Sequence, residues 1–171
     1  YPTGRVFEYD GKKISDQDGW PPVLSGVSRS AREAQTTVIY GGDLFVGVWP
    51  WAEVWRYNPD SRRWAFMSRM FKHPVLSDKI THPYEVENKD HPVQNLWGQR
   101  VTSLVPNGAD LFISTSSKGV DKWLPEKFPF LAPEKWKSYG KVYRATMPGH
   151  LAAPAKWTDG LTTIEFIIRG T

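Results

Sequence analysis

The chain has 171 residues and a net charge of +4, with 14 glycines, 14 prolines, nine tryptophans, seven tyrosines and eight phenylalanines. This composition favours an all-β domain with many turns, the lack of cysteine excludes disulfides, and no apolar run is long enough for a membrane helix. The small charge, without clustered basic runs, argues against a nucleic-acid partner but is compatible with an acidic ligand such as a charged polysaccharide.

Near the N-terminus, one strand and one turn are expected. Residues 4–10 (GRVFEYD) alternate apolar and polar side chains and lead into Asp10-Gly11, which is typical of a strand entering a tight turn. The cluster from Asp16 to Gly19 also predicts a turn.

Four consecutive strands are then predicted, at residues 35–40, 44–49, 52–58 and 63–71. Gly41-Gly42 marks the first turn, and Pro50 ends the second strand because it cannot donate to a β-ladder. Asn58-Pro59-Asp60 marks the last turn. Four antiparallel strands joined by short turns resemble one blade of a β-propeller.

The same unit recurs in the second half of the chain. Strands are expected at 101–105, 111–115 and 140–146, with a hairpin turn at Asn107-Gly108 and a last strand at 162–168. Residues 140–146 (GKVYRAT) align with 52–58 (AEVWRYN) and with 4–10 (GRVFEYD), since each places Val before an aromatic residue. Such repetition predicts an array of modules. We divide the chain into a partial blade (1–27), a blade (28–71), an insertion (72–97) and a second blade (98–171), which contains an insertion at 117–138.

The repeat resembles that of kelch-like β-propellers. The resemblance rests on the glycine turn before the second strand, at Gly41-Gly42-Asp43-Leu44 and again at Asn107-Gly108-Ala109-Asp110-Leu111, and on the Val-aromatic third strand. It covers most of the chain and implies blades of roughly 40 to 50 residues, of which at least four close a propeller. The chain would then be one segment of a larger propeller, completed by further blades or by other chains. Its start at Tyr1 is in keeping with a processed or excised chain.

Both insertions are expected at one end of the second blade. The loop that enters its first strand and the loop between its second and third strands lie at the same end, because each antiparallel strand reverses direction. The strand start at Gly98-Gln99-Arg100 should lie beside them. Loops on a rigid scaffold are common functional positions.

These residues suggest a second resemblance, to propeller-fold polysaccharide lyases of the ulvan-lyase type, which place Tyr, His and Arg on one propeller face. It implies that Arg100 neutralises a uronate carboxylate and that Tyr84 removes the C5 proton, with His82 or His91 assisting. The expected substrate is an acidic polysaccharide that contains uronate, with or without sulfate groups, which implies a secreted or periplasmic protein. The alternative is a non-catalytic propeller module that binds a glycan or a protein.

The remaining candidates are binding residues and a structural metal. Aromatic rings and basic groups suit an anionic sugar chain, and the candidate substrate-binding residues are Trp97, Gln99, Lys118, Lys122, Trp123, Trp136 and Tyr143. No cofactor is expected. A structural metal ion held by His73, His82 and His91 is the weaker possibility, because their spacing matches no common ligand pattern. Glu85, Glu87 and Asp90 leave a glycoside hydrolase open, with no separation fixed by the sequence.

Overall fold

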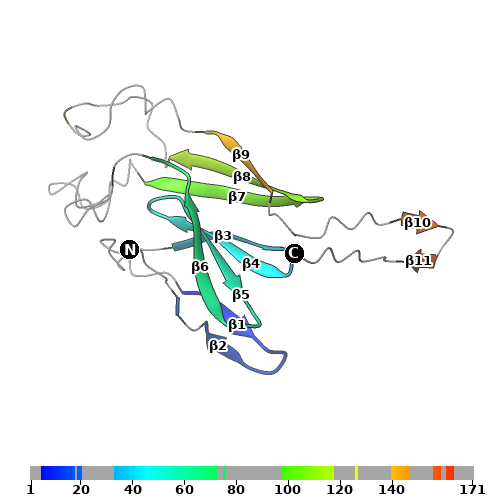
Figure 1. Cartoon of the computed structure of the whole chain (residues 1–171). Coiled ribbons are helices and arrows are strands. Elements are labelled where there is room, and N and C mark those ends of the chain that lie inside the picture. Colours follow the sequence, from blue (N-terminus) through cyan, green and yellow to red (C-terminus); the bar gives the residue numbers. More distant parts are fainter. Residues whose placement is uncertain are drawn as a thin grey trace.

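Figure 1 shows the computed structural model, in which every regular element of the described part is a β-strand. The structure describes residues 5–17, 19–20, 33–72, 75, 98–117, 126, 140–146, 156–158 and 161–163. Within these ranges the strands form antiparallel sheets and no helix is present, so the all-β prediction is confirmed. No closed ring of sheets is seen in the described part.

The first sheet has four strands in the order β3-β4-β5-β6, as the sequence predicted. Their bounds are Glu33–Tyr40 (β3), Asp43–Trp49 (β4), Glu53–Asn58 (β5) and Arg63–Arg69 (β6). Gly41 and Gly42 join β3 to β4 with φ values of 57° and 85°. Because side chains rarely adopt this left-handed region, two glycines here allow the tight hairpin.

The second sheet repeats the first three strands of the first one. It has the order β7-β8-β9, with bounds Gln99–Asn107 (β7), Asp110–Ser117 (β8) and Val142–Thr146 (β9). The β3–β4 ladder has a bulge between Ala34 and Thr36, and the β7–β8 ladder has one between Val101 and Ser103, at the same point of the repeat. The repeat therefore extends from the sequence to the strand register.

An acidic residue after each glycine turn is the second shared feature. Asp43 accepts hydrogen bonds from Arg56 and from Asn58, the latter at 2.8 Å. Its counterpart Asp110 accepts one from Thr146, and an Arg144 Nη1 atom lies 3.9 Å from its carboxylate. Asp43 is buried, whereas Asp110 is about half-buried. The equivalent residues of the first and second sheets are Asp43 and Asp110, Arg56 and Arg144, and Asn58 and Thr146.

The two sheets pack against each other with β7 next to β3 and β4, and Figure 1 shows β7 and β8 above the first sheet in this view. Val101 contacts β4 at Gly47, where an added Cβ atom would lie 2.6 Å from the Cβ atom of Val101. The absence of a side chain at Gly47 thus allows this close approach. The core between the sheets comprises Tyr40, Phe45, Ala52, Val54, Phe71, Val101, Leu104, Leu111 and Ile113.

The other face of the first sheet has a separate aromatic cluster. Val46, Val48 and Trp55 form its buried part, and Trp20 and Trp64 pack against them. The rings of Trp20 and Trp64 lie 5.1 Å apart, centroid to centroid. The middle strands β4 and β5 are therefore buried on both faces, whereas the edge strand β6 is largely exposed.

Two short hairpins complete the described strands. β1 (Phe7–Tyr9) pairs with β2 (Ile14–Asp16), and β10 (Lys156–Thr158) pairs with β11 (Leu161–Thr163). β1 lies where the sequence predicted a strand. β2 was not predicted, and its last residue, Asp16, falls in the turn predicted at 16–19. β11 covers only the start of the expected last strand, and residues 164–168 lie outside the described residues.

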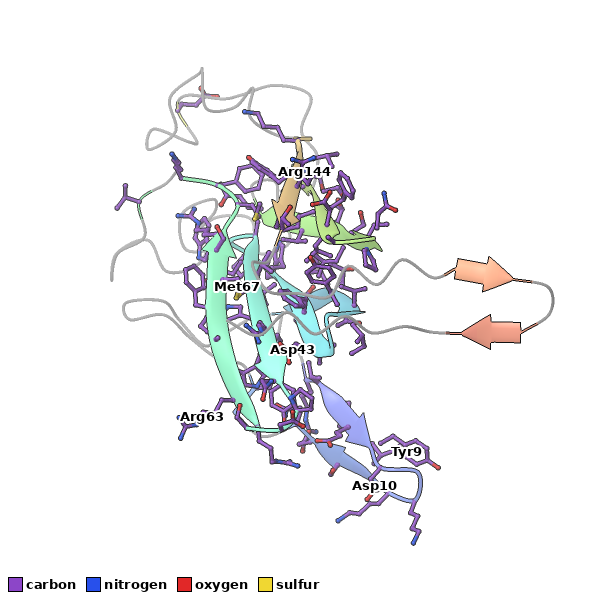
Figure 2. All side chains as sticks on the ribbon, turned by 45° about the vertical axis from the view of Figure 1, so that its right-hand side comes forward. Tyr9, Asp10, Asp43, Arg63, Met67 and Arg144 are labelled. Carbon is purple, nitrogen blue, oxygen red and sulfur yellow. The ribbon has the colours of Figure 1, made fainter. Side chains whose placement is uncertain are left out.

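Asp10 stabilises the loop between β1 and β2, and Figure 2 labels Asp10 beside this loop. Its Oδ1 atom accepts the backbone N–H groups of Lys13 at 2.7 Å and of Lys12 at 2.8 Å. These hydrogen bonds lower the pKa of Asp10 below its ordinary value of 3.8, and the bond from Lys13 has the largest effect.

The lowered pKa gives a pH prediction for this hairpin. The carboxylate stabilises the loop at pH values above its unfolded pKa, and this stabilisation is lost as the pH falls through the lower folded-state pKa. NMR titration should therefore show the amide shifts of Lys12 and Lys13 changing together, with a midpoint below 3.8. A midpoint at or above that value would contradict the proposed loop contacts.

Candidate functional site

The strand ends of the second sheet meet at one end, as the antiparallel argument predicted. Gln99 at the start of β7 lies opposite Ser117 at the end of β8, and Ser114 lies opposite Val142 at the start of β9. β6 ends nearby, since Arg69 contacts Gln99. The two insertions themselves lie outside the described residues.

Gln99 joins the two sheets at this end. Its side chain is fully buried, and its Oε1 atom accepts a hydrogen bond from Arg69 Nη2 at 2.9 Å. Its backbone N–H donates to the Pro50 carbonyl at 2.8 Å, and its carbonyl accepts from the Ala52 N–H at 3.2 Å. These are structural contacts, so a contact between Gln99 and a substrate stays a prediction.

Arg69 and Trp51 are part of the same junction and were not recognised from the sequence. The guanidinium of Arg69 lies over the Trp51 ring, 5.3 Å from its centroid, and its Nε atom donates to the Trp51 carbonyl at 3.2 Å. Such a cation–π contact is stabilising when it is shielded from solvent. In the sequence Arg69 occupied an ordinary position of a predicted strand, which carries no indication of a distant partner.

Arg100 lies on the opposite face of the second sheet from Gln99, because successive residues of a strand alternate. Its side chain is half-buried, and its Nε atom is buried without a hydrogen-bond partner. Among the described residues no carboxylate forms an ion pair with it. Arg100 thus combines partial burial with a charge that no described acidic residue compensates, and such a group is costly to bury unless a further group binds it.

The neighbours of Arg100 on this face are hydroxyl groups. Ser116 lies directly opposite Arg100 across the β7–β8 ladder. Two pairs further along the ladder, the Thr102 Oγ1 and Ser114 Oγ atoms are 2.7 Å apart, and the Ser103 hydroxyl also bonds Ser114. One guanidinium beside a row of hydroxyls can bind an anionic, hydroxyl-rich ligand.

Tyr143 was predicted to bind substrate with Arg100, but the two lie on opposite faces of the second sheet. Tyr143 pairs with Ile113, which is buried between the sheets, and its hydroxyl donates to the Met70 carbonyl at 3.2 Å. Tyr143 instead lines a cavity of about 240 Å³ between the sheets. The structure therefore does not bring Tyr143 and Arg100 together.

The other predicted site residues lie outside the described residues. They are the catalytic candidates His82, Tyr84 and His91, the binding candidates Trp97, Lys118, Lys122, Trp123 and Trp136, and the metal candidate His73. Within the described ranges, no group of three or more His, Asp or Glu side chains could hold a metal ion. The predicted roles of these residues stay predictions.

Glu53 is a buried carboxylate that sequence reasoning missed. It is fully buried and accepts a hydrogen bond from the Trp55 Nε1 atom at 2.7 Å. In the sequence it is a polar residue of an alternating strand, a pattern that indicates exposure.

Comparisons with protein families, with curated proteins and with solved structures find no match to this chain. The resemblances to kelch-like propellers and to ulvan-type lyases therefore stay predictions. In the part of the chain that the structure describes, there is no helix of the length and hydrophobicity needed to cross a membrane.

Proposed function

We propose that the chain is a segment of a β-propeller that binds an acidic, uronate-containing polysaccharide through Arg100 and cleaves it by β-elimination. The half-buried charge of Arg100, which has no acid partner among the described residues, is the observation that carries this proposal. A uronate carboxylate would provide the missing negative charge, and the hydroxyls beside Arg100 suit the sugar ring.

The propeller part of the proposal is supported by the equivalence of the two sheets. Phe45 and Val54 on the first sheet contact the second sheet, and their counterparts on the second sheet are Phe112 and Val142. Val142 is 66% exposed, and Val105 on the same face is 50% exposed. This face carries apolar residues at the positions that bind a neighbouring sheet in the first repeat. A further blade, from a longer polypeptide or another chain, is the partner that fits the part of this face formed by Val105, Phe112 and Val142. The polysaccharide would then reach Arg100 at the end of the same face, where β7 begins and β8 ends.

The chemistry that follows is an elimination. Arg100 would neutralise the uronate carboxylate and thereby acidify the proton on C5. A base removes this proton, the bond between C4 and the glycosidic oxygen breaks, and the departing oxygen is protonated. The product has a C4–C5 double bond conjugated with the carboxylate. Tyr84 is our candidate base, with His82 or His91 as the assisting group. The extracellular distribution of such polymers accords with a secreted or periplasmic protein.

Replacement of Arg100 by alanine tests this proposal. The variant should bind a uronate polymer about tenfold more weakly, since a charge-assisted contact contributes about 1.5 kcal/mol or more. Arg100→Lys should recover part of the affinity, because it keeps the charge but not the bidentate geometry. Turnover would be followed by the ultraviolet absorbance of the unsaturated product. Unchanged binding in Arg100→Ala, with a thermal midpoint equal to wild type, would contradict the proposal.

A non-catalytic binding module is the second candidate, and one observation favours it. On the described part of the Arg100 face the neighbours are Thr102, Ser103, Ser114 and Ser116, with no imidazole or phenol beside them. Saturable binding that depends on Arg100, without any unsaturated product, would support this candidate over the lyase. Full turnover in Tyr84→Phe would exclude Tyr84 as the base.

A further inference from the structure

The outer edge of β9 has no neighbouring strand among the described elements. In the first sheet, the counterpart strand β5 pairs with β6 along its whole length, whereas β9 pairs only with β8. An open edge of this kind exposes backbone N–H and C=O groups that can pair with another strand. The repeat therefore predicts a place for a fourth strand beside β9.

A largely apolar cavity opens next to this edge. It has a volume of about 240 Å³ and is bordered by β6 on one side and by β9 on the other. Figure 2 labels Met67 of β6 and Arg144 of β9, which lie on these two borders. Protein interiors are close-packed, so an apolar space of this size between two sheets calls for an apolar side chain.

The first sheet shows which side chain fills the corresponding position. There Trp64 of the fourth strand lies opposite Tyr57, and their ring centroids are 5.1 Å apart. The counterpart of Tyr57 is Ala145, which lines the cavity. A fourth strand in the same register would place one residue opposite Ala145, on the side of the cavity. The small Ala145 leaves room there for a large ring.

We propose that the β10–β11 hairpin docks on β9, with β10 as the fourth strand and Trp157 at the position that Trp64 holds in the first sheet. Lys156-Trp157-Thr158 repeats the pattern of Arg63-Trp64-Ala65, in which a basic residue, a tryptophan and a small residue follow one another. In the shared register, Thr158 lies opposite Arg144, as Ala65 lies opposite Arg56. The segment proposed to fill the cavity beside β9 is thus part of this same chain.

Docking requires no pairing to be broken. β10 pairs with β11 along one edge, and no other described strand lies on its second edge. The nine residues 147–155 connect β9 to β10 and can span up to about 30 Å, which is ample for a hairpin return. The proposal is independent of the polysaccharide function and would stand if that function failed.

Disulfide trapping tests the docking, because the chain contains no cysteine of its own. The test pair is Arg144→Cys with Thr158→Cys, whose Cβ atoms would come within disulfide distance in the docked register. The matched control is Arg144→Cys with Leu161→Cys. Leu161 pairs with Thr158 in the hairpin, so it would lie two strands from β9, about 10 Å away and too far to cross-link.

The expected result is rapid intramolecular cross-linking of the test pair and at least about tenfold slower cross-linking of the control pair. Adding Trp157→Ala to the test pair should slow cross-linking about tenfold, as expected for loss of a packed aromatic ring, whereas Lys156→Ala should not. Equal rates in the two pairs, no cross-link in the test pair, or a cross-link formed only between molecules would each overturn the proposal. The last of these would assign the strand to a second copy of the chain.

Discussion

Replacement of Gly47 by alanine should destabilise the chain by about 3 kcal/mol, the upper part of the usual range for overpacked cores. The new Cβ atom would lie 2.6 Å from Val101 Cβ and 2.8 Å from Thr36 Cγ2. The Cβ atom of Val101 is fixed by its backbone, so rotation of the Val101 side chain cannot relieve this contact, and the β-branched Thr36 is stiff at χ1. Urea unfolding followed by tryptophan fluorescence would measure the loss.

Two variants separate this steric effect from a general effect of substitution. Ser114→Thr adds one methyl group at the counterpart of Gly47 in the second sheet, where Ser114 is only half-buried, and should change stability by less than about 0.5 kcal/mol. Gly47→Ala combined with Val101→Gly, which removes the contacting Cβ atom of Val101, should be less destabilised than the sum of the two single variants. Additive losses would show that Gly47 and Val101 do not meet as described.

Replacement of Asp43 by alanine should cost about 2 kcal/mol. Its side chain is 5% exposed and accepts hydrogen bonds from Arg56 and Asn58, so its removal leaves two donors without their acceptor. Removing one partner of a fully buried ion pair costs more, about 3–5 kcal/mol. We expect less here because Arg56 is 32% exposed and can be solvated. Thermal or urea unfolding would measure the change.

The second repeat supplies the matched control for this variant. Asp110→Ala removes the equivalent carboxylate, but Asp110 is 28% exposed and its partner Arg144 is 68% exposed. An ion pair this accessible to water contributes little, so the expected loss is below about 1 kcal/mol. Equal losses at Asp43 and Asp110 would contradict the difference in burial between the two repeats.

Much of the strand pattern could be predicted from the sequence because it depends on local chemistry. The strands of both sheets begin and end within two residues of their predicted bounds. Glycine pairs and prolines mark the turns, and apolar alternation marks the strands between them. The equivalence of 52–58 and 140–146 is also confirmed. Trp55 pairs with Val46 in the first sheet, and Tyr143 pairs with Ile113, the residue equivalent to Val46, in the second.

The arrangement of the site depends on contacts that no local pattern contains. The prediction grouped Gln99, Arg100 and Tyr143 around one ligand, but Gln99 and Tyr143 face the first sheet while Arg100 faces away from it. Whether each of these side chains points toward the first sheet or away from it is set by how the two sheets pack. This packing depends on the close contact between Gly47 and Val101. The partners of Gln99, which include Arg69, are distant in the chain, and the sequence gives no sign of them.

The most direct test of the functional account compares a uronate polymer with its carboxyl-reduced, neutral form in titration calorimetry. If Arg100 binds the carboxylate, the wild-type chain should bind the uronate polymer about tenfold more tightly than the neutral form, and Arg100→Ala should bind both forms equally. Equal affinity of the wild-type chain for the two polymers, or an undiminished preference in Arg100→Ala, would contradict the account.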